Sequence, residues 1–109
     1  MNTLKTSKDF LEVISNGQKY TKSGLIFYLL KNNSENIKLG ISIKKKTGNA
    51  VYRNKLKRQI KNLINLNLEK LIGFNLVIIN YVERPKPIKY QELILVFEKF
   101  FKEVKTFKC

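Results

Sequence analysis

The sequence predicts an α+β fold in which one domain, residues 1–109, forms a two-layer α/β sandwich. Three observations support this class. Short segments rich in aromatic and β-branched residues alternate with longer segments whose apolar residues recur at helical spacing. A chain of 109 residues can bury a single core without disulfides or metals. Because 43% of the residues are hydrophobic, a disordered basic tail is excluded.

The first half of the chain predicts one helix followed by three strands. The helix has Ser7 as a favourable N-cap and ends at Asn16-Gly17, a pair typical of a left-handed helix stop. A short edge strand is expected near Tyr20, and longer strands are expected at residues 25–30 and 38–43.

The second half predicts a long helix, a buried strand and a final amphipathic helix. Residues 50–71 repeat apolar side chains at helical spacing, and so do residues 90–104. Residues 75–80 carry a continuous apolar run, which is typical of a central strand. The order of elements is therefore α-β-β-β-α-β-α. The inward face of the long helix is expected to consist of Leu56, Ile60, Leu63, Ile64, Asn67 and Leu71.

Positive charge is concentrated in the middle of the chain. The 22 Lys and Arg residues against 8 Asp and Glu give a formal net charge of +14. The segment KKKTGNAVYRNKLKR, residues 44–58, contains no acid, and there is none anywhere between Glu35 and Glu69. A segregated positive field attracts polyanions, of which nucleic acid is the commonest and an anionic membrane surface the alternative.

The composition also argues against several kinds of site. The chain has no histidine, its acids are scattered, and it has no Cys/His set that could hold zinc, so we expect no catalytic residues and no metal. Neither a Walker-type loop nor a G-x-S-x-G motif is present. No apolar run reaches membrane-spanning length, the N-terminal residues show no secretory signal, and Cys109 is the single cysteine. These features predict a cytoplasmic protein.

The basic segment resembles the signature of the protein subunit of bacterial ribonuclease P. The family pattern is a strand ending in Ser, a Lys-Lys pair, Gly-Asn-Ala-Val, an Arg-Asn-Arg motif and then Lys-Arg. The third motif residue is Lys55 here, which keeps the charge but loses the planar guanidinium. The region after residue 80 departs from the pattern, so no role is carried over to Arg84. The matching positions are Ser42, Lys45, Lys46, residues 48–51, Arg53, Asn54, Lys57 and Arg58.

The resemblance implies an accessory subunit of a tRNA 5′-maturation endoribonuclease. In that family the RNA subunit is the catalyst and uses magnesium ions, whereas the protein itself binds no cofactor. The protein binds the catalytic RNA and the single-stranded 5′ leader of precursor tRNA, which broadens substrate use and lowers the magnesium requirement. Membrane and DNA are not expected partners. The family fold also has a left-handed βαβ crossover, an exception to a strong rule.

Two groups of residues are candidates for these contacts. A helix face rich in cations suits the phosphates of structured RNA, and a helix N-terminus adds backbone N–H groups. We expect the catalytic RNA to contact Lys45, Lys46, Asn49, Arg53, Asn54, Lys57, Arg58 and Lys61. A single-stranded leader needs stacking surfaces on a cationic groove, and Gly40 would give that groove a shallow floor. We expect the leader to contact Phe10, Ile26, Tyr28 and Ser42. Ile14 stands where relatives often carry a second aromatic residue.

Other interpretations of these residues stay open at this point. The charged helix face could be only a solvated face, and Phe10 with Ile14 could belong to the core. Another basic RNA-binding protein, such as a ribosomal protein, would share the composition. A DNA-binding module using the helix at residues 50–71 for recognition is disfavoured, because a strand precedes that helix where a helix-turn-helix needs a second helix.

Overall fold

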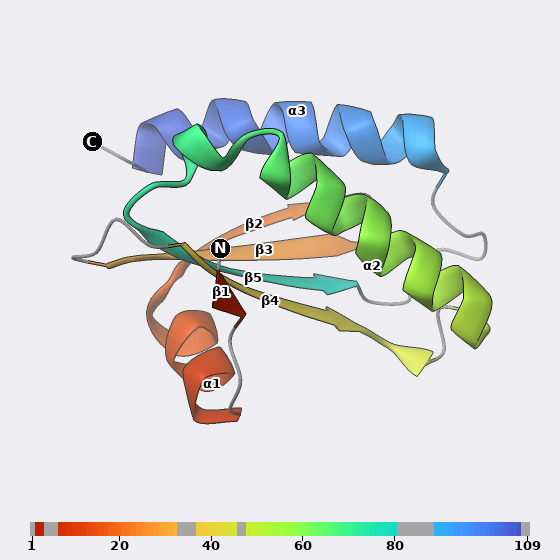
Figure 1. Ribbon diagram of the computed structural model, residues 1–109. Coiled ribbons are helices and arrows are strands. Elements are labelled where there is room, and N and C mark those ends of the chain that lie inside the picture. Colours follow the sequence, from red (N-terminus) through yellow and green to blue (C-terminus); the bar gives the residue numbers. More distant parts are fainter. Residues whose placement is uncertain (1, 4–6, 33–36, 46–47, 81–88, 108–109) are drawn as a thin grey trace.

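The computed structural model describes residues 2–3, 7–32, 37–45, 48–80 and 89–107 (Figure 1). The α+β class and the predicted order of elements are confirmed, with a two-residue strand added before the first helix. Lys46, Arg84 and Cys109, which are discussed above, lie outside the described residues. The elements are β1 (Asn2–Thr3), α1 (Ser7–Asn16), β2 (Gln18–Lys22), β3 (Leu25–Lys31), β4 (Lys38–Ile43), α2 (Ala50–Asn65), the 3-10 segment η2 (Leu68–Lys70), β5 (Phe74–Asn80) and α3 (Tyr90–Phe107).

The strands form one sheet in the order β1-β4-β5-β3-β2. Strand β3 runs antiparallel to both β2 and β5, whereas β4 and β5 are parallel neighbours. Parallel neighbours require a crossover, and α2 supplies it. With α2 above the sheet and β4 in front of β5, the β4-α2-β5 unit in Figure 1 is left-handed, as the family resemblance implied.

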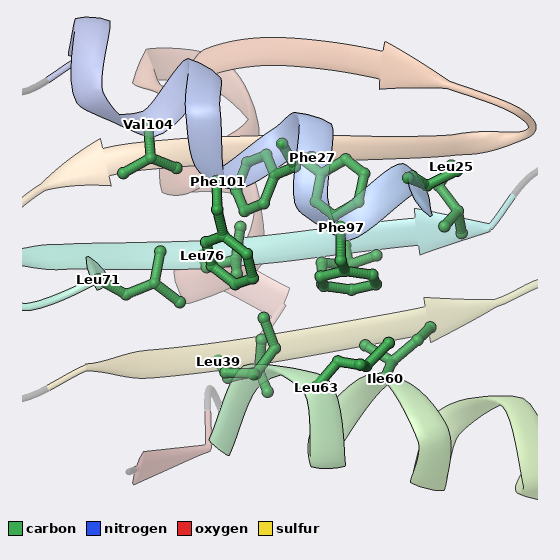
Figure 2. Close-up of a cluster of buried hydrophobic side chains, with 14 of the residues drawn as sticks. Leu25, Phe27, Leu39, Ile60, Leu63, Leu71, Leu76, Phe97, Phe101 and Val104 are labelled. Carbon is green, nitrogen blue, oxygen red and sulfur yellow. The ribbon is translucent and has the colours of Figure 1, made fainter. Parts of the chain in front are cut away.

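Helices cover both faces of this sheet. Helices α2 and α3 lie side by side on one face, whereas α1 packs on the other (Figure 1). The larger core fills the space between the sheet and the α2/α3 pair, as Figure 2 shows. At its centre the Phe27 and Phe100 rings stack with centroids 4.2 Å apart, and Phe97 meets Phe27 edge-on at 5.3 Å.

Strand β3 alternates between the two faces, which explains why its sequence is apolar throughout. Leu25, Phe27 and Leu29 are buried in the larger core. Tyr28 and Leu30 point to the opposite face, where they pack with a smaller cluster on α1. We call this second face, formed by the alternate residues of β2, β3, β4 and β5 on the side of α1, the α1-side face.

Two predicted helix boundaries were wrong. Helix α2 ends at Asn65 instead of residue 71. The Asn67 side-chain amide donates to the Leu63 carbonyl at 2.8 Å, which satisfies an acceptor at the helix end. The chain then turns through η2, and Leu71 is buried outside any helix. Helix α3 continues past residue 104 to Phe107.

Gly17 ends α1 for a different reason from the predicted one. Among the described residues, positive φ angles occur at Ser23, Gly24 and Gly73, so Gly17 is not in the left-handed region. A Cβ atom at Gly17 would lie 2.5 Å from the Val13 carbonyl oxygen and 2.9 Å from that of Leu29. Glycine is therefore required here because the backbone of α1 closely approaches the backbone of β3.

Candidate nucleic-acid interface

Helix α2 is divided lengthwise into a buried face and a cationic face. The buried residues are Leu56, Ile60, Leu63 and Ile64. The cationic face is exposed, and the helix contains no acidic residue. Like charges one turn apart repel by only about 0.2–0.5 kcal/mol per pair. Burying each aliphatic side chain contributes about 1.5–3 kcal/mol, so the packed face can hold the repelling cations in one row. The exposed predicted residues on this face are Asn54, Lys57, Arg58 and Lys61.

Arg53 lies at the border between the two faces. The residue is half-buried, and its Nε atom is buried without a hydrogen-bond acceptor among the described residues. Buried donors are normally hydrogen-bonded, so a buried Nε without a partner is unusual. A partly buried guanidinium can donate two parallel hydrogen bonds to an anion and so bind it in a fixed orientation. Lys57, one turn further along the helix, is exposed.

Asn49 caps the N-terminus of α2. Its side-chain oxygen accepts a hydrogen bond from the Tyr52 backbone N–H at 2.9 Å, and its backbone oxygen accepts from the Arg53 N–H at 3.0 Å. Its φ of −73° and ψ of 173° are typical of an N-cap. The predicted RNA-contacting residue therefore has a structural role that its sequence motif did not reveal.

The turn before α2 brings the chain close to that helix. A Cβ atom at Gly48 would lie 2.7 Å from Cδ2 of the Tyr52 ring, so the turn passes directly over this half-buried side chain. Lys45 is exposed just before the turn, and Lys46 lies outside the described residues. The exposed lysine thus stands between the end of β4 and the N-terminus of α2.

The predicted leader contacts lie together on the α1-side face. Phe10 projects from α1 onto β4, where a Cβ atom at Gly40 would lie 2.6 Å from its Cζ atom. Phe10 and Tyr28 pack against the buried pair Val13 and Val77. The expected shallow floor at Gly40 is therefore filled by the Phe10 ring.

Strand register places the remaining residues in a neighbouring row. Ile26 of β3 pairs with Ile79 of β5, which in turn pairs with Ser42 of β4. All three are half-buried. Ile14, where a second aromatic was missing, is half-buried on α1 beside the Val13 cluster. The face therefore offers apolar and aromatic surface that is only partly covered.

The two surfaces meet at the end of β4. Ser42 lies on the α1-side face near the last residue of the strand, and exposed Lys44 and Lys45 follow directly. Asn49 then caps α2, whose N-terminal end lies beside the end of β4 in Figure 1. A strand immediately before α2 also fits the argument against a helix-turn-helix module.

A groove between α2 and α3 was not anticipated from the sequence. It is lined by Leu63, Asn67, Lys70, Ile94, Phe97, Glu98, Phe101 and Lys102. Lys70 is held there, with its Nζ atom 3.0 Å from Asn67 Oδ1 and 5.2 Å from the centroid of the Phe101 ring. The groove contains none of the predicted contact residues. Asn67 was expected on the inward face of the helix, but it follows the end of α2 at Asn65.

The described part of the chain contains neither a metal-type cluster nor a membrane-spanning helix. No group of three or more His, Cys, Asp or Glu side chains in that part could hold a metal ion. None of its helices is both long and apolar enough to cross a bilayer. What these residues do offer is a cationic helix face next to an aromatic sheet face.

Comparisons with known proteins agree with this geometry. The family model described as Ribonuclease P matches residues 1–105. The "Ribonuclease P protein component" of Clostridium botulinum (strain 657 / Type Ba4) is 40% identical over 80 residues, which cover 72% of each chain. That of Clostridioides difficile (strain 630) is 38% identical over 78 residues, or 70% of this chain and 68% of the relative.

Solved structures show the same fold. The RNase P protein of Staphylococcus aureus superimposes with a TM-score of 0.84 and 25% identity, covering 96% of both chains. The RNase P protein from Thermotoga maritima gives a TM-score of 0.78 and 25% identity, covering 94% of this chain and 97% of the other.

The capping role of Asn49 generates a stability prediction. Replacing Asn49 with Ala should lower the free energy of unfolding by about 1 kcal/mol, because the Tyr52 N–H loses its acceptor. Asn54→Ala is the matched control, since it removes the same side chain from an exposed position inside the same helix. Urea denaturation of both variants measures the difference. Equal stability of the two variants would contradict the capping role.

Proposed function

The chain belongs to the ribonuclease P protein family, and on that premise we propose that it is the RNA-binding subunit of a ribonucleoprotein that removes the 5′ leader from precursor tRNA. The observation that carries the proposal is the pairing of two surfaces. An acid-free cationic helix face adjoins, at the end of β4, a partly covered aromatic sheet face. The first suits phosphates of folded RNA, and the second suits bases of a single strand.

The cationic face of α2 would bind the catalytic RNA. Asn54, Lys57, Arg58 and Lys61 are exposed along the helix and can reach phosphates without any change in the core. Arg53 would add a further charge at the helix border, where its side chain is half-buried and its Nε has no hydrogen-bond partner among the described residues. Backbone N–H groups at the start of α2 add to this positive end, even though the Asn49 side chain occupies one of them.

The α1-side face would bind the leader. Single strands bind to aromatic platforms because every base has a flat face that can stack, and cations near the platform hold the phosphates. Phe10 and Tyr28 are half-buried, so each ring is anchored in the fold while part of it stays open. Ser42 supplies a hydroxyl on the same face, and Ile26 supplies apolar surface.

The chemical step would belong to the RNA subunit. The described residues provide no cluster suited to a metal ion, and we assign the magnesium ions of the reaction to the RNA. The protein would act through binding. Its cations would neutralise RNA phosphates that otherwise need magnesium for screening, and its leader contacts would add affinity for precursor over mature tRNA.

Reconstitution tests this assignment directly. Protein freed of RNA should not cleave precursor tRNA, whereas adding it to a bacterial ribonuclease P RNA should accelerate cleavage at low magnesium concentration. The 5′ ends of the products, mapped by primer extension, should match those of mature tRNA. Cleavage by the protein alone, or no stimulation of the RNA, would overturn the proposal.

The salt dependence of RNA binding tests the α2 face. The double change Arg58→Ala and Lys61→Ala should flatten the plot of log affinity for the catalytic RNA against log salt. Two lost phosphate contacts lower the slope by about 1.4–1.8, because each contact contributes about 0.7–0.9.

The control for this experiment is the double change Lys99→Ala and Lys102→Ala. These lysines are also exposed, and they have the same three-residue spacing on a helix. The control should leave the slope unchanged. Equal slopes in the two double variants would mean that the α2 face is only solvated.

Truncation of Phe10 tests the leader face. Phe10→Ala should weaken binding of the reconstituted holoenzyme to precursor tRNA by about 1–3 kcal/mol, the contribution of one stacked base. Affinity for mature tRNA should stay unchanged. Leu11→Ala is the control, because the neighbouring side chain on α1 is 61% exposed and truncating it leaves the face intact.

A second variant separates stacking from stability, because a core aromatic residue lost to Ala costs about 3–5 kcal/mol. Gly40→Ala keeps the Phe10 ring but forces it to move, since the new Cβ would lie 2.6 Å from Cζ. It should reduce affinity for precursor tRNA in the same selective way. Equal losses for precursor and mature tRNA would instead assign Phe10 to the core alone.

A further inference from the structure

The edge strand β2 contributes a lysine to the α1-side face. In the antiparallel pair of β2 and β3, Lys19 lies directly opposite Tyr28. Residues opposite each other in such a pair share a face and lie within reach of each other's side chains. Lys19 is exposed, and Tyr28 is half-buried.

The side on which Lys19 lies follows from its neighbour in sequence. Tyr20 points into the larger core, where its ring centroid lies 5.9 Å from that of Phe27 and 6.0 Å from that of Phe100. Successive side chains of a strand point to opposite faces. Lys19 and Thr21 therefore lie on the α1-side face, whereas Lys22 lies on the side of α3.

Register extends this pair into a row across strands β2, β3, β5 and β4. Lys19 pairs with Tyr28, Tyr28 with Val77, and Val77 with Gly40. The Phe10 ring covers the Gly40 end of the row. Strands β4 and β2 are three spacings apart, or about 14 Å, so the row has an aromatic ring near one end and a lysine at the other.

The charges that strands β2 to β5 direct toward this face are of one sign. The residues that β2 to β5 direct toward it comprise two lysines and no acid within the described part of these strands. They are Lys19, Thr21, Ile26, Tyr28, Leu30, Lys38, Gly40, Ser42, Asn75, Val77 and Ile79. A polyanion crossing the sheet from β4 toward β2 would meet a cation where the sheet ends.

We propose that Lys19 binds a backbone phosphate of the 5′ leader, and that the leader crosses the sheet from the Phe10 end of the row to the β2 edge. This inference rests on the proposed function and extends it to a residue outside the basic segment. The phosphates of a nucleotide whose base stacks on Tyr28 would lie beside the ring. On the side of the ring that faces the open edge of the sheet, the neighbouring residue is Lys19. A flexible ammonium group there would hold the strand without reading its sequence.

A matched pair of variants on one strand tests the proposal. Lys19→Ala and Lys22→Ala remove the same exposed side chain from β2, but from opposite faces. Edge lysines also protect a sheet from pairing with other chains, and both residues would share that role. In the reconstituted holoenzyme, Lys19→Ala should lower affinity for precursor tRNA with a long leader and reduce the salt slope by about 0.7, the value for one single-strand phosphate contact. Lys22→Ala should change neither, and mature tRNA should bind both variants like the unaltered protein.

Neutral methylphosphonate linkages placed singly along the leader locate the contact. A methylphosphonate at one position should weaken binding to the unaltered holoenzyme. The same substitution should have no further effect on binding to the Lys19→Ala holoenzyme. Equal behaviour of the two lysine variants, or a loss with Lys19→Ala that extends to mature tRNA, would overturn the proposal. If Phe10→Ala still weakens leader binding selectively in that case, only the Lys19 extension fails. If neither Lys19→Ala nor Phe10→Ala weakens binding of precursor tRNA more than that of mature tRNA, the assignment of the leader to the α1-side face is wrong.

Discussion

Burial of β5 on both faces is the constraint on which the rest of this structure depends. Leu76, Val77 and Ile78 are each fully buried, although their side chains point to alternate sides of the sheet. A strand of this kind needs a helical layer above it and cover below it. Helices α2 and α3 bury Leu76 and Ile78 in the larger core, and α1 buries Val77 through Val13.

The asymmetry of this cover produces the two surfaces. On the α2/α3 side, two long helices cover the sheet, so what α2 presents to a partner is its outer row of cations. On the other side the ten residues of α1 cover only part of the sheet. Phe10 and Tyr28 are therefore packed on one side and exposed on the other. One face of the sheet supports a charged helix surface, and the other supports a stacking surface.

The parallel pairing of β4 with β5 joins these surfaces. Because β4 must be followed by a crossover, the chain leaves Ser42 on the α1-side face and reaches the start of α2 within a few residues. Gly48 allows the turn to pass over the Tyr52 ring, and Asn49 stabilises the helix that begins there. The segment richest in cations is thus also the segment that connects the two faces. An RNA bound along α2 and a strand bound on the sheet would lie next to each other at this point.

The sequence by itself determined the order of the elements, the position of the cations and the family. These depend on local patterns: helical spacing in α2, apolar runs in β3 and β5, and a motif of contiguous residues. The predicted contact residues described here do lie on two surfaces, but their roles stay predictions. Tertiary structure decided what depends on residues distant in the chain. The Leu29 carbonyl on β3 leaves no room for a side chain at Gly17, and Phe10 fills the space above Gly40. Lys19 joins Tyr28 only through the β2–β3 register, because a one-residue slip would turn it to the opposite face.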